Sequence, residues 1–310
     1  MTSPGAGSPH SSGYVLSAEV RDALASRRPI VALESTVIAH GLPRPRNLEA
    51  AISLEGVVRS HGAVPATVAV IDGVPRIGLS AQELERLATA DDVHKLSTRD
   101  LPVTVARRRT GATTVAATAF LASKVGIPVF ATGGIGGAHR GTPVDISADL
   151  GQLARTKILV VSAGAKSILD LPATREVLET LGVLVLGFRT DTLPAFYSRD
   201  SGLPVDARVD DPQEVAAIWR AHRESGIDAG ILLCVPIPEE AALPGDQLEG
   251  IITAALRRAE EEGIRGKDIT PYLLREVGRS TGGASIEANL ALLVNNVSVA
   301  AAVAVRIAEG

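Results

Sequence analysis

The chain contains very few of the residues that build disulfides or aromatic stacking surfaces. Cys234 is the only cysteine among 310 residues, so an internal disulfide and a cysteine-rich metal site are both excluded. Aromatic residues make up only 3% of the sequence, which argues against the base-stacking platforms of proteins that bind single-stranded nucleic acid. A single free cysteine is typical of a reducing compartment, so we expect a cytoplasmic location.

The sequence also lacks an excess of one charge and a long stretch without polar residues. The 31 basic and 35 acidic residues give a net charge of −4, so we expect no nucleic-acid partner and no membrane partner. The most apolar segment, ANLALLVNNVSVAAAVAVRIAEG, is interrupted by Asn289, Asn295 and Asn296. It suits a helix buried in protein better than a helix in lipid.

Serine, glycine and proline dominate the N-terminus, MTSPGAGSPHSSGYV. This segment has no apolar run of the kind that secretory signals contain. Its composition offers too little apolar surface to offset the entropy lost on folding. We therefore predict a disordered tail over residues 1–15, followed by a single domain over residues 16–310.

Short apolar runs alternate with amphipathic segments along the rest of the chain. Strands are expected at residues 30–33, 67–71, 128–131, 158–162, 184–187 and 230–235. Helices are expected at residues 48–60, 81–90, 114–125, 147–155, 167–181, 212–224 and 247–262, with two more starting at Pro271 and Ser285. Asp211 and Thr270, each followed by proline, are expected to cap helices. The pattern predicts an α/β fold, a single domain with a central, mostly parallel sheet flanked by helices (an α/β/α sandwich).

The loops that follow the strands are the expected ligand-binding segments, because ligands of such sheets bind beyond the carboxyl ends of the strands. The loop at residues 133–137 is rich in glycine, but the third glycine of a dinucleotide fingerprint would fall at His139. The lysine of a phosphate-binding loop follows glycine, whereas Lys166 follows Ala165. NAD and ATP are therefore disfavoured, and no nucleotide cofactor is expected. The glycines allow either close approach of the backbone to a ligand or a simple tight turn.

Polar residues in several of these loops are candidates for chemistry. Glu34 ends the first expected strand, so it is a candidate acid or base unless a salt bridge holds it. Thr114 lies at a helix start that would attract an anion, with Lys95 as countercharge, although plain N-capping and a solvated lysine explain both equally well. Asp145 and Asp149 suit a hard divalent ion, unless one of them caps the helix at residue 147.

Lys166 follows an apolar strand and the small residues of SAGA, at the expected start of a helix. If it is partly buried, its amine loses charge, as a Schiff-base nucleophile requires. The same position also suits a phosphate ligand, or a surface lysine that extends its amine to solvent. The residues alone leave these three interpretations open.

Eight motifs carry a resemblance to a known family. They are VALESTVIAHGLP, GAVPATVAVIDG, FATGGIGGAHRG, DISADL, SAGAKSILDLP, PAFYSR, PIPEE and TGGASIEANLALLVNN, in this order. From about Leu16 to its end, the chain resembles the pseudouridine-5'-phosphate glycosidase family. The resemblance implies a homotrimer that reversibly cleaves pseudouridine 5'-phosphate to uracil and ribose 5-phosphate, with one divalent ion per chain, usually Mn²⁺.

The resemblance also implies roles for individual residues. Lys166 in AGAKS would be the nucleophile that forms a Schiff base, Glu34 in ALEST the proton donor, and Asp145 the metal ligand. Residues that match the substrate-binding positions are Lys95, Val115, Ser147, Ala148 and Asp149, and the same pocket would include His139 and Asn289. Thr114 joins this set through its place at the helix start.

Two other functions stay open. One is a different Schiff-base lyase that acts on sugar phosphates, such as an aldolase-like enzyme. The other is a non-catalytic protein that binds sugar phosphates without turnover. The presence of both Glu34 and Lys166 argues against the second alternative.

Overall fold

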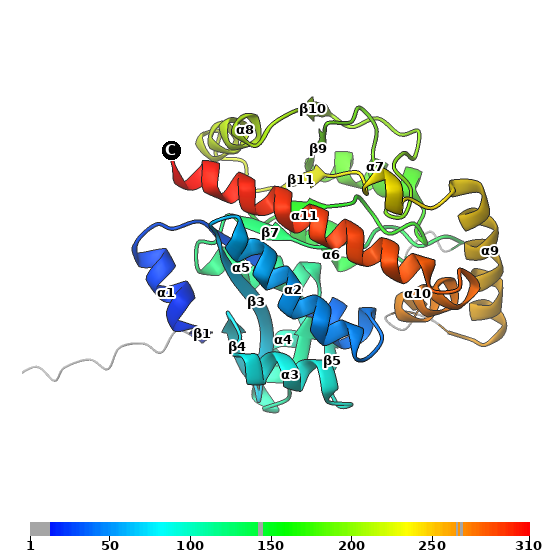
Figure 1. Cartoon of the computed structure of the whole chain (residues 1–310), viewed down its shortest axis with the longest axis horizontal. Coiled ribbons are helices and arrows are strands. Elements are labelled where there is room, and N and C mark those ends of the chain that lie inside the picture. The colour runs from blue at the N-terminus through cyan, green and yellow to red at the C-terminus, as the bar shows by residue number, and fades with distance from the viewer. Residues whose placement is uncertain (1–12, 142–144, 265, 267–268) are drawn as a thin grey trace, which may run out of the picture.

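The computed structural model of the chain describes residues 13–141, 145–264, 266 and 269–310 (Figure 1). Its strands are β1 (Val15–Leu16), β2 (Ile30–Leu33), β3 (Val64–Ile71), β4 (Val74–Ile77), β5 (His94–Leu96), β6 (Gly111–Thr113), β7 (Val129–Ala131), β8 (Leu159–Ser162), β9 (Leu184–Phe188), β10 (Ala207–Val209) and β11 (Ile231–Cys234). Its α-helices are α1 (Ala18–Ala25), α2 (Arg46–Ser60), α3 (Ala81–Thr89), α4 (Leu101–Ala106), α5 (Val115–Lys124), α6 (Ala148–Leu153), α7 (Leu171–Thr180), α8 (Pro212–Glu224), α9 (Gly245–Glu261), α10 (Ile269–Ser280) and α11 (Ala284–Ala308). A π-helical turn, η1, covers Val37–Gly41.

The strands form one sheet in the order β1-β4-β3-β2-β7-β8-β11-β9-β10, and β6 pairs with β3 and β5 beside this row. Among the described strands, only the β3–β4 and β3–β6 pairs are antiparallel. Every residue of the central strands β2, β7, β8 and β11 is buried. Strands covered on both faces read as continuous apolar runs, which is why the sequence revealed them. The predicted mostly parallel sheet in a single domain is confirmed.

Helices cover both faces of the sheet. Helix α11 contacts β2, β7 and β8 and packs against α2 and α8. Helices α5 and α6 pack together, and α5 contacts β2, β3 and β7. In Figure 1, α11 and α2 lie in front of these strands, whereas α5 and α6 lie behind them. The expected α/β/α sandwich is therefore the observed arrangement.

Helix α11 is long and apolar enough to cross a membrane by length and composition, with a mean hydropathy of 1.9. Its asparagines are therefore a weaker argument against a membrane span than the sequence suggested. Its contacts with the sheet show a core helix instead. The Asn296 side chain donates to the carbonyl oxygens of Thr132 and Gly133 at 2.9 and 3.2 Å. This polar residue therefore anchors the loop that follows β7.

Most predicted elements are present, and several boundaries differ. Strands β1, β4, β5, β6 and β10 and helices α1 and α4 were not predicted, because they are short or carry polar residues. The helix expected from Ser167 begins only at Leu171, since Asp170 caps it by accepting from the Ala173 N–H at 2.9 Å.

Two further boundaries need correction. Asp211 caps α8 as predicted, but Thr270 lies inside α10, which begins at Ile269, so it is not a cap. Proline is tolerated there because the first helical turn lacks intrahelical acceptors. Val15 falls within the expected disordered tail, but it lies in β1 and pairs with Arg76 of β4. Residues 1–12 of that tail lie outside the described residues.

Candidate active site

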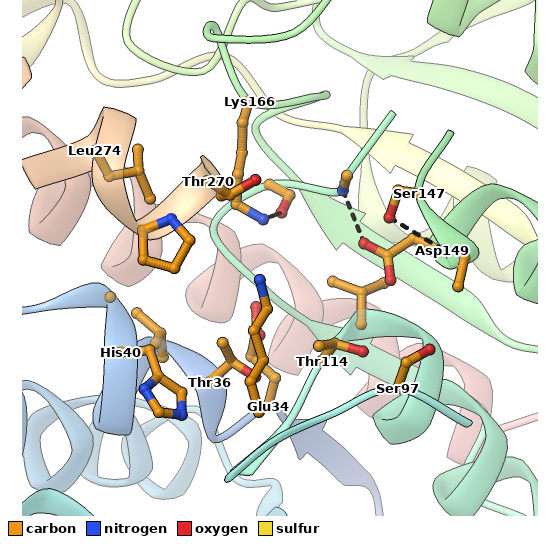
Figure 2. A pocket seen from close by; sticks show the side chains of 18 of the residues that line it. Glu34, Thr36, His40, Ser97, Thr114, Ser147, Asp149, Lys166, Thr270 and Leu274 are labelled. Carbon is orange, nitrogen blue, oxygen red and sulfur yellow. Dashed lines mark hydrogen bonds between the residues drawn. The ribbon is translucent and has the colours of Figure 1, made fainter. Parts of the chain in front are cut away.

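A cavity of about 340 Å³ opens at the carboxyl ends of the strands. All eleven predicted site residues line it: Glu34, Lys95, Thr114, Val115, His139, Asp145, Ser147, Ala148, Asp149, Lys166 and Asn289. They come from segments far apart in sequence. They meet here because parallel strands present their carboxyl ends at one edge of a sheet. In Figure 2, Lys166 lies above and Glu34 below, with Thr114, Ser147 and Asp149 to their right and His40 and Leu274 to their left.

The loops after β7 and β8 are joined by backbone hydrogen bonds. The Ala163 N–H donates to the carbonyl of Gly133 at 2.9 Å, and the Ile135 N–H donates to the carbonyl of Gly164 at 3.0 Å. The Lys166 N–H then donates to the carbonyl of Ile135 at 3.1 Å. The backbone of Lys166 is thus fixed against the glycine-rich loop, so its side chain starts from a defined position.

The Lys166 side chain turns back over that same loop. Its Nζ donates to the carbonyl oxygen of Gly134 at 2.9 Å, and the residue is half-buried. Gly164, in the loop just before Lys166, has a φ of 77°, and a Cβ there would lie 2.2 Å from the carbonyl oxygen of Pro194, so this loop packs closely against the segment at Pro194. A surface lysine extended to solvent, one of the three interpretations, does not fit this geometry.

Glu34 lies directly after β2 with its carboxyl group buried. The Thr132 hydroxyl donates to Glu34 Oε1. Burial raises the pKa of Glu34, while the charge of Lys166 and the hydrogen bond from Thr132 oppose the rise. A raised pKa favours the protonated carboxyl group, which suits a proton donor. No salt bridge to Glu34 occurs among the described residues. The strongest charge that acts on its carboxyl group is that of Lys166.

Asp149 occupies the start of α5 rather than capping its own helix. Ser147 is the N-cap of α6, and its Oγ accepts from the Asp149 N–H at 3.2 Å. The Asp149 carboxylate accepts from the N–H groups of Ala116 at 2.9 Å and Gly136 at 2.8 Å. One amide at the start of α5 thus binds a carboxylate of the protein itself, which the helix dipole favours at this position.

The glycine-rich loop serves close packing. None of the glycines at 133–137 has a positive φ, so a tight turn does not explain them. A Cβ on Gly136 would lie 2.3 Å from Ser147 Oγ, and one on Gly134 would lie 2.6 Å from the Phe196 ring. The absent side chains let the cavity wall, including Ser147, approach the backbone of this loop.

Two threonine hydroxyls at the cavity are buried without a protein partner in the described part of the chain. They are Thr36 Oγ1 and Thr114 Oγ1. Thr114 is the N-cap of α5 by position, but its side chain makes no capping bond, so plain N-capping does not account for it. A buried polar group without a partner costs about 1–3 kcal/mol. Such groups are commonly satisfied by a polar ligand or by water.

Asp145 is the candidate metal ligand. It is half-buried, lines the cavity, and its backbone carbonyl accepts from the His139 N–H at 2.9 Å. Burial lowers the pKa of His139. The described residues contain no group of three or more His, Cys, Asp or Glu side chains arranged to hold a metal. With one carboxylate as its direct protein ligand, a hard divalent ion at Asp145 would have to keep most of its waters. Residues 142–144 of this loop lie outside the described residues.

The cavity also includes residues that the sequence analysis did not name as site residues. They include Thr36, His40, Ser97, Arg99, Phe196, Thr270 and Leu274. His40 and Phe196 lie inside the motifs ALESTVIAHGLP and PAFYSR, so their motifs were a signal that could have found them. Phe196 has a φ of 62°, which is rare for a bulky residue. Helix α10 gave no signal, because nothing in its sequence shows that it covers this edge of the sheet.

Comparison with known proteins assigns the chain to a family. Residues 19–306 match the family described as Indigoidine synthase A like protein. A pseudouridine-5'-phosphate glycosidase of Herpetosiphon aurantiacus is 57% identical over 293 residues, which cover 94% of this chain and 97% of that protein. A pseudouridine-5'-phosphate glycosidase of Symbiobacterium thermophilum is 52% identical, with 96% and 99% covered.

Solved structures show the same fold. The prealnumycin C-glycosynthase AlnA, in complex with ribulose 5-phosphate, has a TM-score of 0.88 and 41% identity, with 96% of this chain and 97% of that chain covered. An indigoidine synthase A-like protein of Thermotoga maritima has a TM-score of 0.89 and 36% identity, with 97% and 99% covered. The arrangement of sheet and helices described above is therefore shared with these proteins.

Proposed function

Since the chain belongs to the pseudouridine-5'-phosphate glycosidase family and is an enzyme of that family, we propose that it reversibly cleaves the C1'–C5 bond of pseudouridine 5'-phosphate to uracil and ribose 5-phosphate. The observation that carries the proposal is the meeting of Glu34 and Lys166 in one cavity. The sugar phosphate bound to AlnA supports a sugar-phosphate substrate for this fold.

The substrate explains why a lysine is needed. Ordinary glycosidases protonate a leaving oxygen, whereas here the leaving atom is a ring carbon with no lone pair to protonate. In the proposed first step, the uracil N1 proton leaves, electrons move through the ring, and a C5=C1' double bond forms. The C1'–O4' bond breaks and O4' takes a proton. The neutral amine of Lys166 then adds to C1', and N1 regains its proton.

The second half of the proposed reaction breaks the carbon–carbon bond. Glu34 delivers a proton to uracil C5, the Lys166 nitrogen forms an iminium with C1', and the C1'–C5 electron pair restores the C5=C6 double bond of uracil. Water then adds to C1', the C1'–N bond breaks, and ribose 5-phosphate leaves in its open form. The net reaction consumes one water and regenerates both side chains. The pKa of Glu34, raised by burial, suits this donation.

A divalent ion such as Mn²⁺ would be held by Asp145 through one carboxylate and several waters, and it would supply positive charge near the substrate. The chain's own residues would do the rest. Lys95 and the start of α5 at Val115 would bind the phosphate, and the buried hydroxyls of Thr36 and Thr114 would bind polar groups of the substrate.

Uracil release tests this proposal. Incubation of the protein with pseudouridine 5'-phosphate and Mn²⁺ should release uracil, measured by its absorbance after chromatography. A different Schiff-base lyase would trap a sugar phosphate on the protein but release no uracil. A non-catalytic binding protein would bind ribose 5-phosphate and do neither.

Removal of the phosphate group from the substrate should strongly reduce the rate at which the enzyme cleaves it. Lys95 is half-buried at the cavity and its charge lowers the pKa of Glu34, so it is not a distant solvated lysine. We expect pseudouridine to be a very poor substrate, because binding energy from the phosphate helps to orient C1'. We also expect Lys95→Ala to raise the KM for ribose 5-phosphate at least about tenfold more than the KM for uracil.

Steady-state kinetics of the synthetic reaction measure both KM values. Lys124→Ala, which removes an exposed lysine at the end of α5, is the matched control and should change neither. Equal effects of Lys95→Ala on the two KM values would place Lys95 away from the phosphate.

Removal of the metal should abolish turnover reversibly. Asp145 is the single carboxylate proposed to bind the ion directly, so the protein should bind Mn²⁺ with modest affinity and a chelator should remove the ion completely. We expect Mn²⁺ to restore activity, and Asp145→Asn to weaken Mn²⁺ binding by at least about tenfold in calorimetry. Asp228→Asn, which alters a surface ion pair with Lys157, is the control. Full activity after exhaustive chelation would remove the metal from the mechanism.

The resemblance to the family also leads us to propose a homotrimer, and the cytoplasmic location stays a prediction. Many enzymes assemble with closed cyclic symmetry. Light scattering at working concentration should report about three chains per particle. A clean monomer would contradict the proposed assembly and would show that one chain completes the active site.

A further inference from the structure

Arg140 links the metal-binding loop to the loop that carries the nucleophile. It follows His139 directly, and its side chain points away from the main cavity, which it does not line. Its Nε donates to the carbonyl of Leu169 at 3.0 Å, and its Nη2 donates to the carbonyl of Ser167 at 3.1 Å. One guanidinium group therefore binds two carbonyls that follow Lys166.

These two carbonyls belong to a short turn that begins at the proposed nucleophile. The Leu169 N–H donates to the carbonyl of Lys166 at 3.0 Å and closes the turn. Because the turn is too short to be held by helical hydrogen bonds, its orientation depends on outside partners. Arg140 supplies two hydrogen bonds to the turn, and because its donors are fixed in one plane, these bonds define the orientation of the turn. A shift of this turn would move the start of the Lys166 side chain.

Glu249 of α9 holds the guanidinium from the other side. Arg140 Nη1 donates to Glu249 Oε1, and Nη2 donates to Oε2 at 3.0 Å, which makes the pair bidentate. The hydrogen bond from Arg140 lowers the pKa of Glu249. Helix α9 packs against α10, which contributes Thr270, Pro271 and Leu274 to the cavity wall. The same guanidinium thus connects the nucleophile loop to the helices at the cavity mouth.

We propose that Arg140 is a positioning residue for Lys166, and that Glu249 orients its guanidinium. Lysine cannot replace it, because an ammonium group lacks the planar fork that reaches two carbonyls and a carboxylate together. A misplacement of about 1 Å at a reacting group costs on the order of 100-fold in rate. The inference rests on the proposed nucleophilic role of Lys166.

The test measures Schiff-base formation directly. Wild type, Arg140→Ala, Arg140→Lys and Glu249→Gln are incubated with ribose 5-phosphate and borohydride, and the rate of covalent trapping is followed by mass spectrometry. We expect Arg140→Ala and Arg140→Lys to lower the trapping rate and kcat by about 10- to 100-fold. We expect the KM for ribose 5-phosphate to stay within about threefold, since Arg140 binds no substrate.

Chemical rescue separates positioning from general stability. Arg140 and Glu249 line a second, open cavity of about 150 Å³, so a guanidinium ion from solution can reach the vacated place. We expect millimolar guanidinium to raise the trapping rate of Arg140→Ala severalfold and to leave Arg140→Lys unchanged. Arg59→Ala is the matched control, because Arg59 is likewise ion-paired, with Glu19 and Glu55, but does not line either cavity. It should trap at the wild-type rate.

Several results would contradict the proposed role of Arg140. Trapping by Arg140→Ala and Glu249→Gln within twofold of wild type would overturn the inference. So would a loss of rate that equals the loss of folded protein in thermal denaturation, with no response to guanidinium. If Arg140→Ala does not fold, Glu249→Gln decides, with at least a threefold loss expected. A wild-type protein that releases no uracil and traps no sugar would instead refute the proposed function.

Discussion

Lys166→Ala is expected to fold, to bind ribose 5-phosphate, and to lose nearly all turnover. The amine forms the covalent bond to C1' in the proposed mechanism, so no neighbouring group can replace it. Its backbone is held by Ile135 and its Nζ by the carbonyl of Gly134, and these are contacts of the loop rather than of the core. Thermal denaturation should therefore show little loss of stability, while kcat falls by several orders of magnitude.

Covalent trapping identifies the nucleophile. Ribose 5-phosphate and borohydride should fix the sugar to the wild-type chain, and peptide mapping should place the adduct on Lys166. Lys166→Arg should fail as well, because its guanidinium stays charged and cannot form an imine. Lys124→Ala is the matched control and should trap normally. A pure phosphate ligand would tolerate arginine and give no adduct, and an adduct on Lys95 would move the role to that residue.

Glu34→Gln should lower kcat by about 10²- to 10⁴-fold, the usual contribution of a positioned acid or base. Glutamine keeps the shape of the side chain and accepts from the Thr132 hydroxyl as the carboxyl group does, but it has no proton to deliver. The KM for ribose 5-phosphate should change little. Glu55→Gln is the matched control, since Glu55 also accepts from a threonine hydroxyl, that of Thr67 at 2.7 Å, outside the cavity. Near wild-type turnover by Glu34→Gln would remove Glu34 from proton transfer.

The pH dependence of Glu34 gives a second measurement. Burial raises its pKa above the ordinary value of 4.5, so between that value and the raised one the folded chain binds a proton that the unfolded chain releases. Stability contributed by Glu34 is therefore present at low pH and is lost as the pH rises through the folded pKa. Activity that needs the protonated acid should fall over the same range. In Glu34→Gln, the loss of stability over this range should disappear.

The sequence by itself determined the central strands of the sheet, and it predicted eleven residues that line the cavity. The central strands are buried on both faces, so their apolar runs stand out without any tertiary information. Glu34 and Lys166 each follow such a strand. Because parallel strands end at a common edge, their position in sequence already predicts that they lie near one another.

Only the tertiary structure decided how the loops are held. Sequence could not show that the Asp149 carboxylate binds the Ala116 and Gly136 amides, because these residues lie in three separate segments. The helix expected at Ser167 begins later, since the turn before Asp170 is bound by other loops instead of by its own helix. Local propensity carries no information about such partners.

The C-terminal helices also show which features the sequence predicts and which only the tertiary structure reveals. The sequence favoured a buried helix for α11 although its composition is apolar enough for lipid, and its contacts with the sheet confirm a core helix. Only the structure shows that Asn296 of this helix anchors the loop after β7. Helix α10 lines the same cavity as residues more than a hundred positions before it. The bidentate pair of Arg140 and Glu249 also joins residues more than a hundred positions apart. Periodicity and motifs report the local chain, whereas contacts between distant side chains arise only when the packed sheet brings their elements together.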